Sequence, residues 1–466
     1  MRRFTSIFSI GLCLNLLIPV VVFGQDYYNV ELLDNWQDSS LVSNSSEAKY
    51  NDCWGYEQNG IEYALVGSTE GIHFLKINDD ATLTEVDFVR GKFSSMSVVH
   101  RDIKVFKNYL YAVCDEGASS LQIIDLSYLP DSAHVVMEND SSFARVHNLF
   151  FDEENELMYV CAVTPNVSGI PQALISMQVY SVTNPVLPVL LFTGPNDINE
   201  VHDAFVRNNI AYLNCGFDGL RVYDFSIPNS PVFLQNLNIY QDQGYNHQGW
   251  LSPDGNNYVF ADETNGKRLK RCEVSSDNTV SIENKFGTDF IDNSIPHNLM
   301  VSDNFVFCAY YNLGLRIYNL NSPTLEEVAH YDTYPEEVSF QGNGAWGVYS
   351  ELPSERIIVS DRHHGLFLFD FNRAIQQTNN DASIGVYPNP TIPGSDITIK
   401  LKETNIPFFQ LSVTDLKGKI VFSDFFQNQN FGVVKLNLSR GVYTIEVIYF
   451  NKLGDIIQEN KRIVIQ

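Results

Sequence analysis

One unit of about fifty residues occurs seven times between Trp54 and Phe371, and this repetition constrains the fold more than any other feature of the chain. Five of the copies open with a histidine, and the first and last open with a tryptophan. The opening positions are Trp54, His100, His147, His202, His247, His297 and Trp346. Regular spacing of this size is typical of a propeller or a solenoid.

Each copy contains the same series of strand patterns. The opening residue begins a short alternating segment such as DAFVR, and an apolar segment such as LYAVC follows. A turn then leads to a third segment of strict pattern, as in GLRVYDF, and most copies end in a variable fourth segment. Alternation bounded by turn residues indicates strands. The sequence therefore predicts an all-β fold, with a seven-bladed β-propeller over residues 25–374.

The two ends of the repeat region are expected to meet. The last copy stops after its third strand, at Phe371, whereas the segment from Asn29 to Gln37 resembles the fourth strands of the other copies. We expect this segment to complete the last blade, because closing the ring in this way leaves no open sheet edge.

Residues 1–24 have the pattern of a secretory signal peptide. Arg2 and Arg3 form the basic start, an apolar segment follows, and a small-residue cleavage site precedes Gln25. The apolar segment is short for a membrane span and is followed at once by polar sequence. We expect cleavage and export, with no transmembrane segment in the mature chain.

The chain has a formal net charge of −26, and residues 25–385 carry all of the negative excess, since both ends of the chain are slightly basic. A surface of this sign repels nucleic acid, so we expect no nucleic-acid partner. It suits a soluble secreted protein and would attract cations.

The third segment of each copy, with its preceding glycine and trailing Asp or Asn, resembles the LVIVD repeat. The whole repeat region is similar to the choice-of-anchor B group of exported bacterial proteins. The resemblance covers roughly residues 25–372 and rests on the register of the copies, with KRLKRCEV at residues 267–274 departing most from the pattern. It implies a propeller but no defined activity.

A polar linker, residues 375–385, leads to a second and smaller unit. Residues 386–466 alternate apolar and polar positions between turns, which predicts a small β-sandwich. Its motif positions are Tyr387, Pro388, Asn389, Pro390, Gly418, Gly441, Tyr443 and Lys461. In order and spacing they resemble the C-terminal sorting domain of the type IX secretion system, although an ordinary carbohydrate-binding sandwich is the alternative. The resemblance implies a Bacteroidetes-type bacterium, the type IX machinery as partner, and export through the periplasm to the outer cell surface or the medium, with removal of the tail.

The histidines that open the repeats are the first candidate site. The innermost strand of each propeller blade lines the central channel, so residues that begin those strands surround one channel mouth. The candidate ligand or metal residues are His100, Asp102, His147, His202, Asp203, His247, His297, Trp54 and Trp346. Imidazoles converging with carboxylates suit a divalent metal and could also serve acid–base catalysis. The structural alternative, which repetition itself favours, is that each histidine hydrogen-bonds a neighbouring blade.

The turns after the second strands are a second candidate. Their acidic positions are Asp115, Glu116, Asp218, Asp262, Glu263 and Asp361. Asp361 stands beside the only adjacent histidine pair, His363 and His364, which could hold a metal or could be solvated turn residues.

Two functions remain open. The chain lacks a nucleophile motif, a P-loop, zinc-type cysteine spacing and a calcium loop, which favours a propeller that binds an extracellular protein or glycan without catalysis. The alternative is a polysaccharide lyase that works at a histidine-lined, metal-binding channel. Because a lyase acting on uronates needs cationic side chains and this domain is acidic, we place the enzyme second.

Overall fold

The computed structural model describes residues 27–139, 143–287, 294–322, 324–335, 342–371, 373, 384–387, 389, 391–401, 407–415, 417–450 and 456–465. The predicted signal peptide, residues 1–24, lies outside these residues, as do most of the predicted linker and two of the sorting-motif positions, Pro388 and Pro390. Among the described residues, no helix is long and apolar enough to span a membrane.

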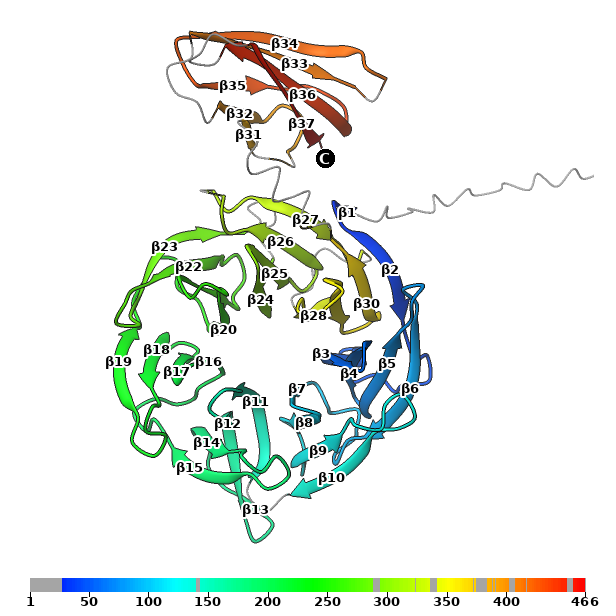
Figure 1. The fold of residues 1–466 in the computed structure, drawn as a ribbon, viewed down its shortest axis with the longest axis vertical. Coiled ribbons are helices and arrows are strands. Elements are labelled where there is room, and N and C mark those ends of the chain that lie inside the picture. Colours follow the sequence, from blue (N-terminus) through cyan, green and yellow to red (C-terminus); the bar gives the residue numbers. More distant parts are fainter. Residues whose placement is uncertain are drawn as a thin grey trace, which may run out of the picture.

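Seven antiparallel sheets surround a central channel, as Figure 1 shows, and this confirms the predicted seven-bladed propeller. The innermost strands are β3 (Tyr50–Gln58), β7 (Arg101–Phe106), β11 (Phe143–Asp152), β16 (Asp203–Arg207), β20 (Asn246–Leu251), β24 (Leu299–Ser302) and β28 (Ala345–Tyr349). The second strands are β4 (Ile61–Ser68), β8 (Tyr109–Cys114), β12 (Leu157–Val167), β17 (Ile210–Asn214), β21 (Asn257–Asp262), β25 (Phe305–Ala309) and β29 (Ile357–Asp361).

The outer half of each blade comes from the third and fourth segments. The third strands are β5 (Gly71–Ile77), β9 (Leu121–Asp125), β14 (Ile175–Ser181), β18 (Leu220–Asp224), β22 (Leu269–Val274), β26 (Leu315–Asn319) and β30 (Gly365–Asp370). The fourth strands are β6 (Leu83–Arg90), β10 (His134–Asn139), β15 (Val189–Thr193), β19 (Val232–Leu237), β23 (Val280–Phe286), β27 (Glu327–Tyr331) and, in the last blade, β2 (Glu31–Trp36). A short β13 (Ile170–Pro171) extends the third blade beside β12.

The N-terminal strand completes the last blade, as predicted. β2 pairs antiparallel with β30, which places Leu32 opposite Phe369 and Trp36 opposite Leu366. The side-chain amide of Asn35 adds two bonds, donating to the carbonyls of His364 at 2.8 Å and of Leu366 at 3.2 Å. β1 (Tyr27–Tyr28) adds a fifth strand to the neighbouring blade by pairing with β27. The ring therefore closes through strands from opposite ends of the repeat region.

Apolar side chains of the second and third strands form the core. A tyrosine recurs near the start of five second strands, and all five copies are buried. They are Tyr63, Tyr111, Tyr159, Tyr212 and Tyr258. The hydroxyl of Tyr111 donates to the carbonyl of Pro185 in the next blade at 2.6 Å. These aromatic rings fill the space between blades, which explains why the repeat requires an aromatic at this position.

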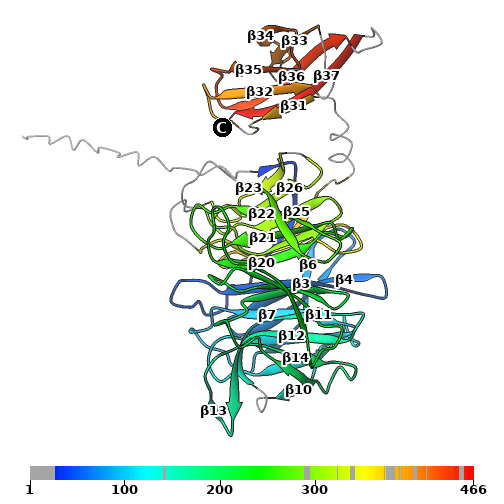
Figure 2. The same ribbon diagram turned by 90° about the vertical axis from the view of Figure 1, so that its left-hand side faces the viewer.

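The C-terminal unit is a small sandwich of two sheets with its own core, and Figure 2 shows the sheets stacked face to face. One sheet contains β31 (Ile384–Tyr387), β32 (Asp396–Leu401) and β35 (Phe431–Lys435). The other contains β33 (Phe408–Thr414), β34 (Ile420–Gln427), β36 (Gly441–Phe450) and β37 (Ile456–Ile465). Inward apolar positions alternate along these strands, as the sequence predicts for a sandwich.

Candidate functional site

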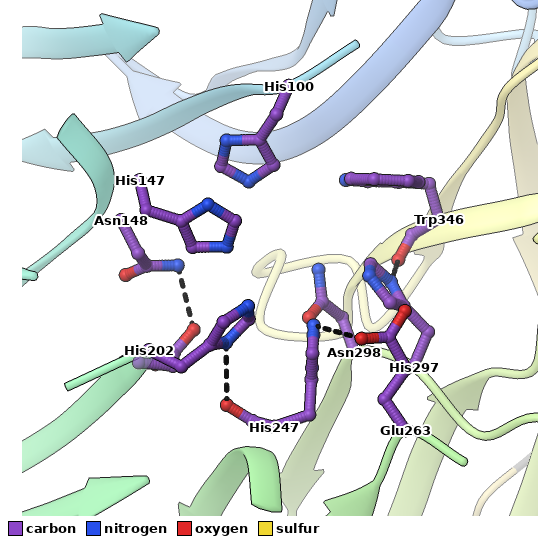
Figure 3. A pocket seen from close by; sticks show the side chains of 10 residues that line it. His100, His147, Asn148, His202, His247, Glu263, His297, Asn298 and Trp346 are labelled. Carbon is purple, nitrogen blue, oxygen red and sulfur yellow. Dashed lines mark hydrogen bonds and ion pairs between the residues drawn. The ribbon is translucent and has the colours of Figure 1, made fainter. Parts of the chain in front are cut away.

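Six aromatic side chains form a closed ring at the channel mouth, and Figure 3 shows them around a shared cavity. They are the five repeat histidines, His100, His147, His202, His247 and His297, together with Trp346. Neighbouring ring centroids in that order lie 4.1, 4.1, 4.3, 4.4 and 4.4 Å apart, and the step from Trp346 back to His100 is 5.8 Å. The enclosed cavity measures about 80 Å³ and is also lined by Asn148, Asp203, Glu263 and Asn298.

Two of the ring residues lie at register shifts in their inner strands. The pairing of β20 with β21 shifts register between Asn246 and Gln248, at His247, and that of β28 with β29 shifts between Ala345 and Gly347, at Trp346. A bulge inserts an unpaired residue and re-aims its side chain. In three other blades the residue after the ring histidine also lines the cavity: Asn148 follows His147, Asp203 follows His202 and Asn298 follows His297.

Polar side chains of the inner strands join neighbouring blades by hydrogen bonds. Asp52 accepts the backbone N–H of Ile103 at 3.3 Å, and Asp102 accepts that of Leu149 at 2.9 Å. In the same way, Gln248 accepts the N–H of Leu299 at 2.9 Å. A further bond runs from the amide of Asn148 to Asp203 at 2.7 Å. The inter-blade role that the sequence offered for the histidines is therefore shared. Their polar neighbours, including the candidates Asp102 and Asp203, carry part of it, and His202 and His297 carry part of it through Nδ1.

A buried lysine, which sequence analysis missed, lies beneath the ring. The ammonium of Lys104 is 2.5 Å from Asp102 and 3.0 Å from Asp52. Burial opposes the charge on Lys104, but the two carboxylates outweigh it and raise the pKa of the lysine. Burial also raises the pKa of Asp52 to about 7, although Lys104 acts in the opposite direction. These three side chains form an ion trio in which one ammonium lies between two carboxylates.

A layer of aromatic side chains closes the channel below the ion trio, and the prediction for Trp54 is corrected here. Trp54 follows Asp52 by two residues, as Phe150 follows Asn148, and it therefore lies deeper than the mouth. Its ring is 4.9 Å from that of Tyr349 and 6.5 Å from that of Trp250, with Lys104 over it at 4.8 Å. The register shift in β3 lies between Tyr50 and Cys53, before Trp54, so Trp54 belongs to the regular ladder opposite Leu65 and not to the bulge.

Hydrogen bonds at Nδ1 orient three of the imidazoles. His202 donates from Nδ1 to the carbonyl of His247 at 3.1 Å, and His297 donates to that of Trp346 at 2.7 Å. His147 Nδ1 lies 3.0 Å from the carboxylate of Asp115. Each of these rings keeps its Nε2 lone pair for a ligand, which is the arrangement that metal-binding histidines show in proteins.

The ring is mostly uncharged. Burial, followed by the charge of neighbouring histidines, holds the pKa of His100, His202 and His247 well below the ordinary histidine value. Burial lowers the pKa of His297 to about 3. His147 differs: burial lowers its pKa, but the hydrogen bond and charge of Asp115 outweigh burial and leave the pKa raised. Neutral imidazoles are lone-pair donors, so the ring can bind a cation or accept hydrogen bonds.

Two of the acidic turn positions reach the ring. Asp115 contacts His147, and Glu263, which follows β21, lines the cavity with its carboxylate 3.6 Å from Nε2 of His247. Tyr311, which sequence analysis also missed, donates its hydroxyl to Glu263 at 2.5 Å. The repeated Asp or Glu after the second strand was the available signal for Glu263. No comparable pattern marks Tyr311.

The secondary candidates Asp361, His363 and His364 hold a turn. Asp361 is buried and accepts the backbone N–H groups of His363 and His364 at 2.9 Å each, as well as the hydroxyl of Thr333 at 2.7 Å. His364 donates from Nδ1 to the carbonyl of Thr333 at 2.8 Å. Most of their polar atoms bond the surrounding protein, whereas Nδ1 of His363 has no hydrogen-bond partner among the described residues, and none of the three side chains lines the cavity.

Comparison with known proteins assigns the tail. Residues 385–466 match the family described as the secretion system C-terminal sorting domain. No curated protein matches the chain in sequence. The chain is therefore exported across the outer membrane to the cell surface or beyond.

A solved structure supports the propeller fold. The WD40 repeats of RRP9 share 11% identity at a TM-score of 0.51, covering 74% of this chain and 98% of theirs. At such low identity this match shows the fold alone. Two other structures are similar at lower TM-scores. The extracellular domain of BT4673, from a one-component system of B. thetaiotaomicron, shares 12% identity at a TM-score of 0.44, covering 93% of this chain and 60% of that one. A Bacteroides fragilis protein named for 6-phosphogluconolactonase shares 10% identity at a TM-score of 0.46, covering 84% of this chain and all of its own.

The motif positions of the sorting domain shape its turns and edges. The side chain of Asn389 accepts the N–H of Val464 at 2.9 Å and so ties the start of the domain to its last strand. Tyr443 donates its hydroxyl to the carbonyl of Ser439 at 2.9 Å. Gly418 and Gly441 have φ values of 78° and 156°, which favour glycine. Lys461 lies in β37 opposite Ile445, and Tyr387 ends β31.

Proposed function

We propose that this protein is a secreted or cell-surface propeller that binds an extracellular glycan at its histidine-lined channel mouth and does not act on it chemically. The observation that carries the proposal is an exposed aromatic beside the ring. Phe217 is 77% exposed, and its ring packs against Tyr245 at 5.1 Å. Tyr245 in turn lies 5.2 Å from His202. An aromatic surface next to convergent polar groups is the usual composition of a ligand site.

The size and chemistry of the cavity favour a glycan over a protein. A volume of about 80 Å³ admits one small polar group, such as a sugar hydroxyl with its water, and not a folded loop. The lining offers imidazole, amide and carboxylate groups, which exchange hydrogen bonds with hydroxyls. A sugar ring could stack on Phe217 while one of its hydroxyls enters the cavity.

The charge around the mouth favours an uncharged glycan and places the lyase second. Asp115, which is 41% exposed, and Glu263 carry negative charge at the ring. No Arg or Lys lines the cavity in the described part of the chain. Arg362 packs its guanidinium on Trp346 at 4.9 Å, and its side chain donates to the carbonyl of Gly342. A uronate carboxylate would find little to neutralise it here.

A glycan-binding assay tests the proposal. The purified protein and its Phe217→Ala variant are applied to neutral and acidic glycans. Phe233→Ala is the control variant, because it removes a half-exposed aromatic from the outer strand β19. We expect binding to a neutral glycan that weakens about tenfold or more in Phe217→Ala and is unchanged in Phe233→Ala. Equal binding by all three proteins, or binding only to a protein ligand, would refute it. Unsaturated products from an acidic polysaccharide would establish the lyase instead.

We further propose that the propeller belongs with the LVIVD-repeat, choice-of-anchor B proteins. The third-strand pattern that carries this resemblance forms β5, β9, β14, β18, β26 and β30, which occupy equivalent places in their blades. β22, the strand of the divergent KRLKRCEV segment, occupies the corresponding place, so the departure is in sequence and not in topology.

We also propose that the chain is processed at both ends, after residue 24 and in the linker over residues 375–385. The support is the signal-peptide pattern at one end and the sorting domain at the other. Mass spectrometry of the protein recovered from the cell surface and the medium tests this. A product that retains residues 386–466 would refute removal of the tail.

A further inference from the structure

We infer that His247, Glu263 and His297 hold a divalent transition metal of the zinc class at the channel mouth, with an open coordination position toward the cavity. This inference goes beyond the proposed glycan binding and does not depend on it. One ligand atom from each of the three side chains lies within 4.8 Å of the other two. All three side chains line the same cavity in Figure 3.

The spacing of the ligand atoms fits a shared ion better than a direct contact. Nε2 of His247 and a carboxylate oxygen of Glu263 are 3.6 Å apart. That distance is too long for a hydrogen bond between them. Two ligand atoms on one tetrahedral zinc ion, each about 2.0–2.2 Å from the metal, are separated by about 3.3–3.6 Å. The imidazole and the carboxylate therefore already stand at the separation that a common metal requires.

Neighbouring groups hold two of the three ligands in place. His297 donates from Nδ1 to the carbonyl of Trp346 at 2.7 Å, which directs its Nε2 lone pair into the cavity. Tyr311 donates its hydroxyl to one oxygen of Glu263 at 2.5 Å, which leaves the other oxygen facing His247. The ring of Tyr311 also packs on that of His297 at 4.5 Å. Metal-binding histidines and carboxylates are typically oriented by such outer hydrogen bonds.

Within the described residues, one polar atom of this cluster has no hydrogen-bond partner. Nδ1 of His247 is buried and has no hydrogen-bond partner within the described residues. A buried nitrogen without a partner requires an explanation. A cation at Nε2 leaves Nδ1 of His247 as it is, but it gives this buried imidazole one strong contact and compensates for the burial of the adjacent carboxylate.

The ligand set selects the class of metal. Two imidazole nitrogens and one carboxylate oxygen suit zinc and its neighbours cobalt, nickel and copper, whereas magnesium and calcium prefer oxygen ligands throughout. Three protein ligands leave the fourth tetrahedral position for water or for a ligand group. That position opens on the cavity shared with His202 and Asn298.

Zinc titration of matched variants tests the site. The protein is purified without a polyhistidine tag, dialysed against a chelator, and titrated with Zn²⁺ by calorimetry. Glu263→Gln keeps the shape of the side chain and an oxygen that can accept the hydroxyl of Tyr311, but it removes the anionic ligand. Glu200→Gln is the matched control, because Glu200 accepts the hydroxyl of Tyr245 in the same way but lies outside the cavity lining. We expect one equivalent of zinc in the wild type and in Glu200→Gln, and affinity reduced about tenfold or more in Glu263→Gln.

Two further readouts separate the site from a folding effect. Zinc should raise the melting temperature of the wild type and of Glu200→Gln but not that of Glu263→Gln, while the metal-free proteins melt alike. Co²⁺ in the wild type should give the intense visible absorption of a four-coordinate ion. The absence of zinc binding in the wild type, or equal affinity in Glu263→Gln, would overturn the inference. Either result leaves glycan binding, which is tested through Phe217, undisturbed.

Discussion

The imidazole of His100 stacks on that of His147 in the next blade, with ring centroids 4.1 Å apart and an angle of 6° between the planes. Two protonated rings at this separation would repel each other strongly. The surroundings shift the pKa values of the two imidazoles in opposite directions. Burial and the charge of His147 lower the pKa of His100, whereas Asp115 raises the pKa of His147. The first proton that the pair takes up therefore binds to His147.

Replacing Asp115 by asparagine should lower the pKa of His147 below the ordinary histidine value. The carboxylate is the largest influence that raises this pKa, and burial, which lowers it, would then dominate. Histidine-selective NMR titration measures the change directly. Asp218→Asn is the control, since Asp218 occupies the corresponding turn two blades further on and does not line the cavity.

The same substitution should change how stability depends on pH. Because the folded-state pKa of His147 is raised, its contribution to stability is fully present below the unfolded-state value of about 6.5 and is lost as the pH rises through the folded-state pKa. The difference in unfolding free energy between wild type and Asp115→Asn should therefore be largest at acidic pH. A difference that grows toward alkaline pH would contradict this account.

Replacing Lys104 by methionine should destabilise the propeller by about 3–5 kcal/mol at neutral pH. The substitution leaves the carboxylates of Asp52 and Asp102 buried without their cation. Urea unfolding measures the loss. The triple variant Asp52→Asn/Asp102→Asn/Lys104→Met should recover most of it, because no uncompensated charge remains. A single variant as stable as the wild type would show that the ion trio does not stabilise the fold.

Removing β2 should open the ring. A chain that begins at residue 38 exposes β30 as an unpaired edge and loses the packing of Trp36 on Tyr50, whose ring centroids are 6.1 Å apart. We expect a much lower melting temperature and association through the exposed edge, measured by calorimetry and by light scattering. A chain that begins at residue 30 loses only β1 and is the control. Equal behaviour of the two truncated chains would contradict the closure role of β2.

The sorting domain should direct export without the propeller. A reporter protein with a signal peptide at its N-terminus and residues 385–466 at its C-terminus should reach the cell surface or the medium in a bacterium that has the secretion system. The full chain without these residues should remain in the periplasm and keep its melting temperature, because the sandwich has a separate core. Cell fractionation and immunoblotting distinguish the two locations. Release of the truncated chain would contradict the assignment.

The convergence of the histidines was predictable, whereas their partners were not. Five histidines at one repeat position must meet wherever the blades meet, since a closed ring brings equivalent positions to the same depth. Trp54 was assigned to the mouth because its distance to the next opening matches the repeat length, but the register shift in β3 lies before it, between Tyr50 and Cys53, so Trp54 falls deeper along the strand. Spacing counts residues along the chain, and a bulge changes which of those residues faces the channel.

Four features could be predicted from the sequence: the number of blades, the order of strands within each, the closing role of the N-terminal strand and the presence of a sorting tail. They follow from local alternation, repetition and motif order, which are written along the chain. The sequence did not predict that Lys104 lies between Asp52 and Asp102, that Asp115 contacts His147, or that Glu263 faces His247. These contacts join different blades, or a turn to an inner strand. Their distances depend on how the sheets pack around the channel, and no local pattern records that packing.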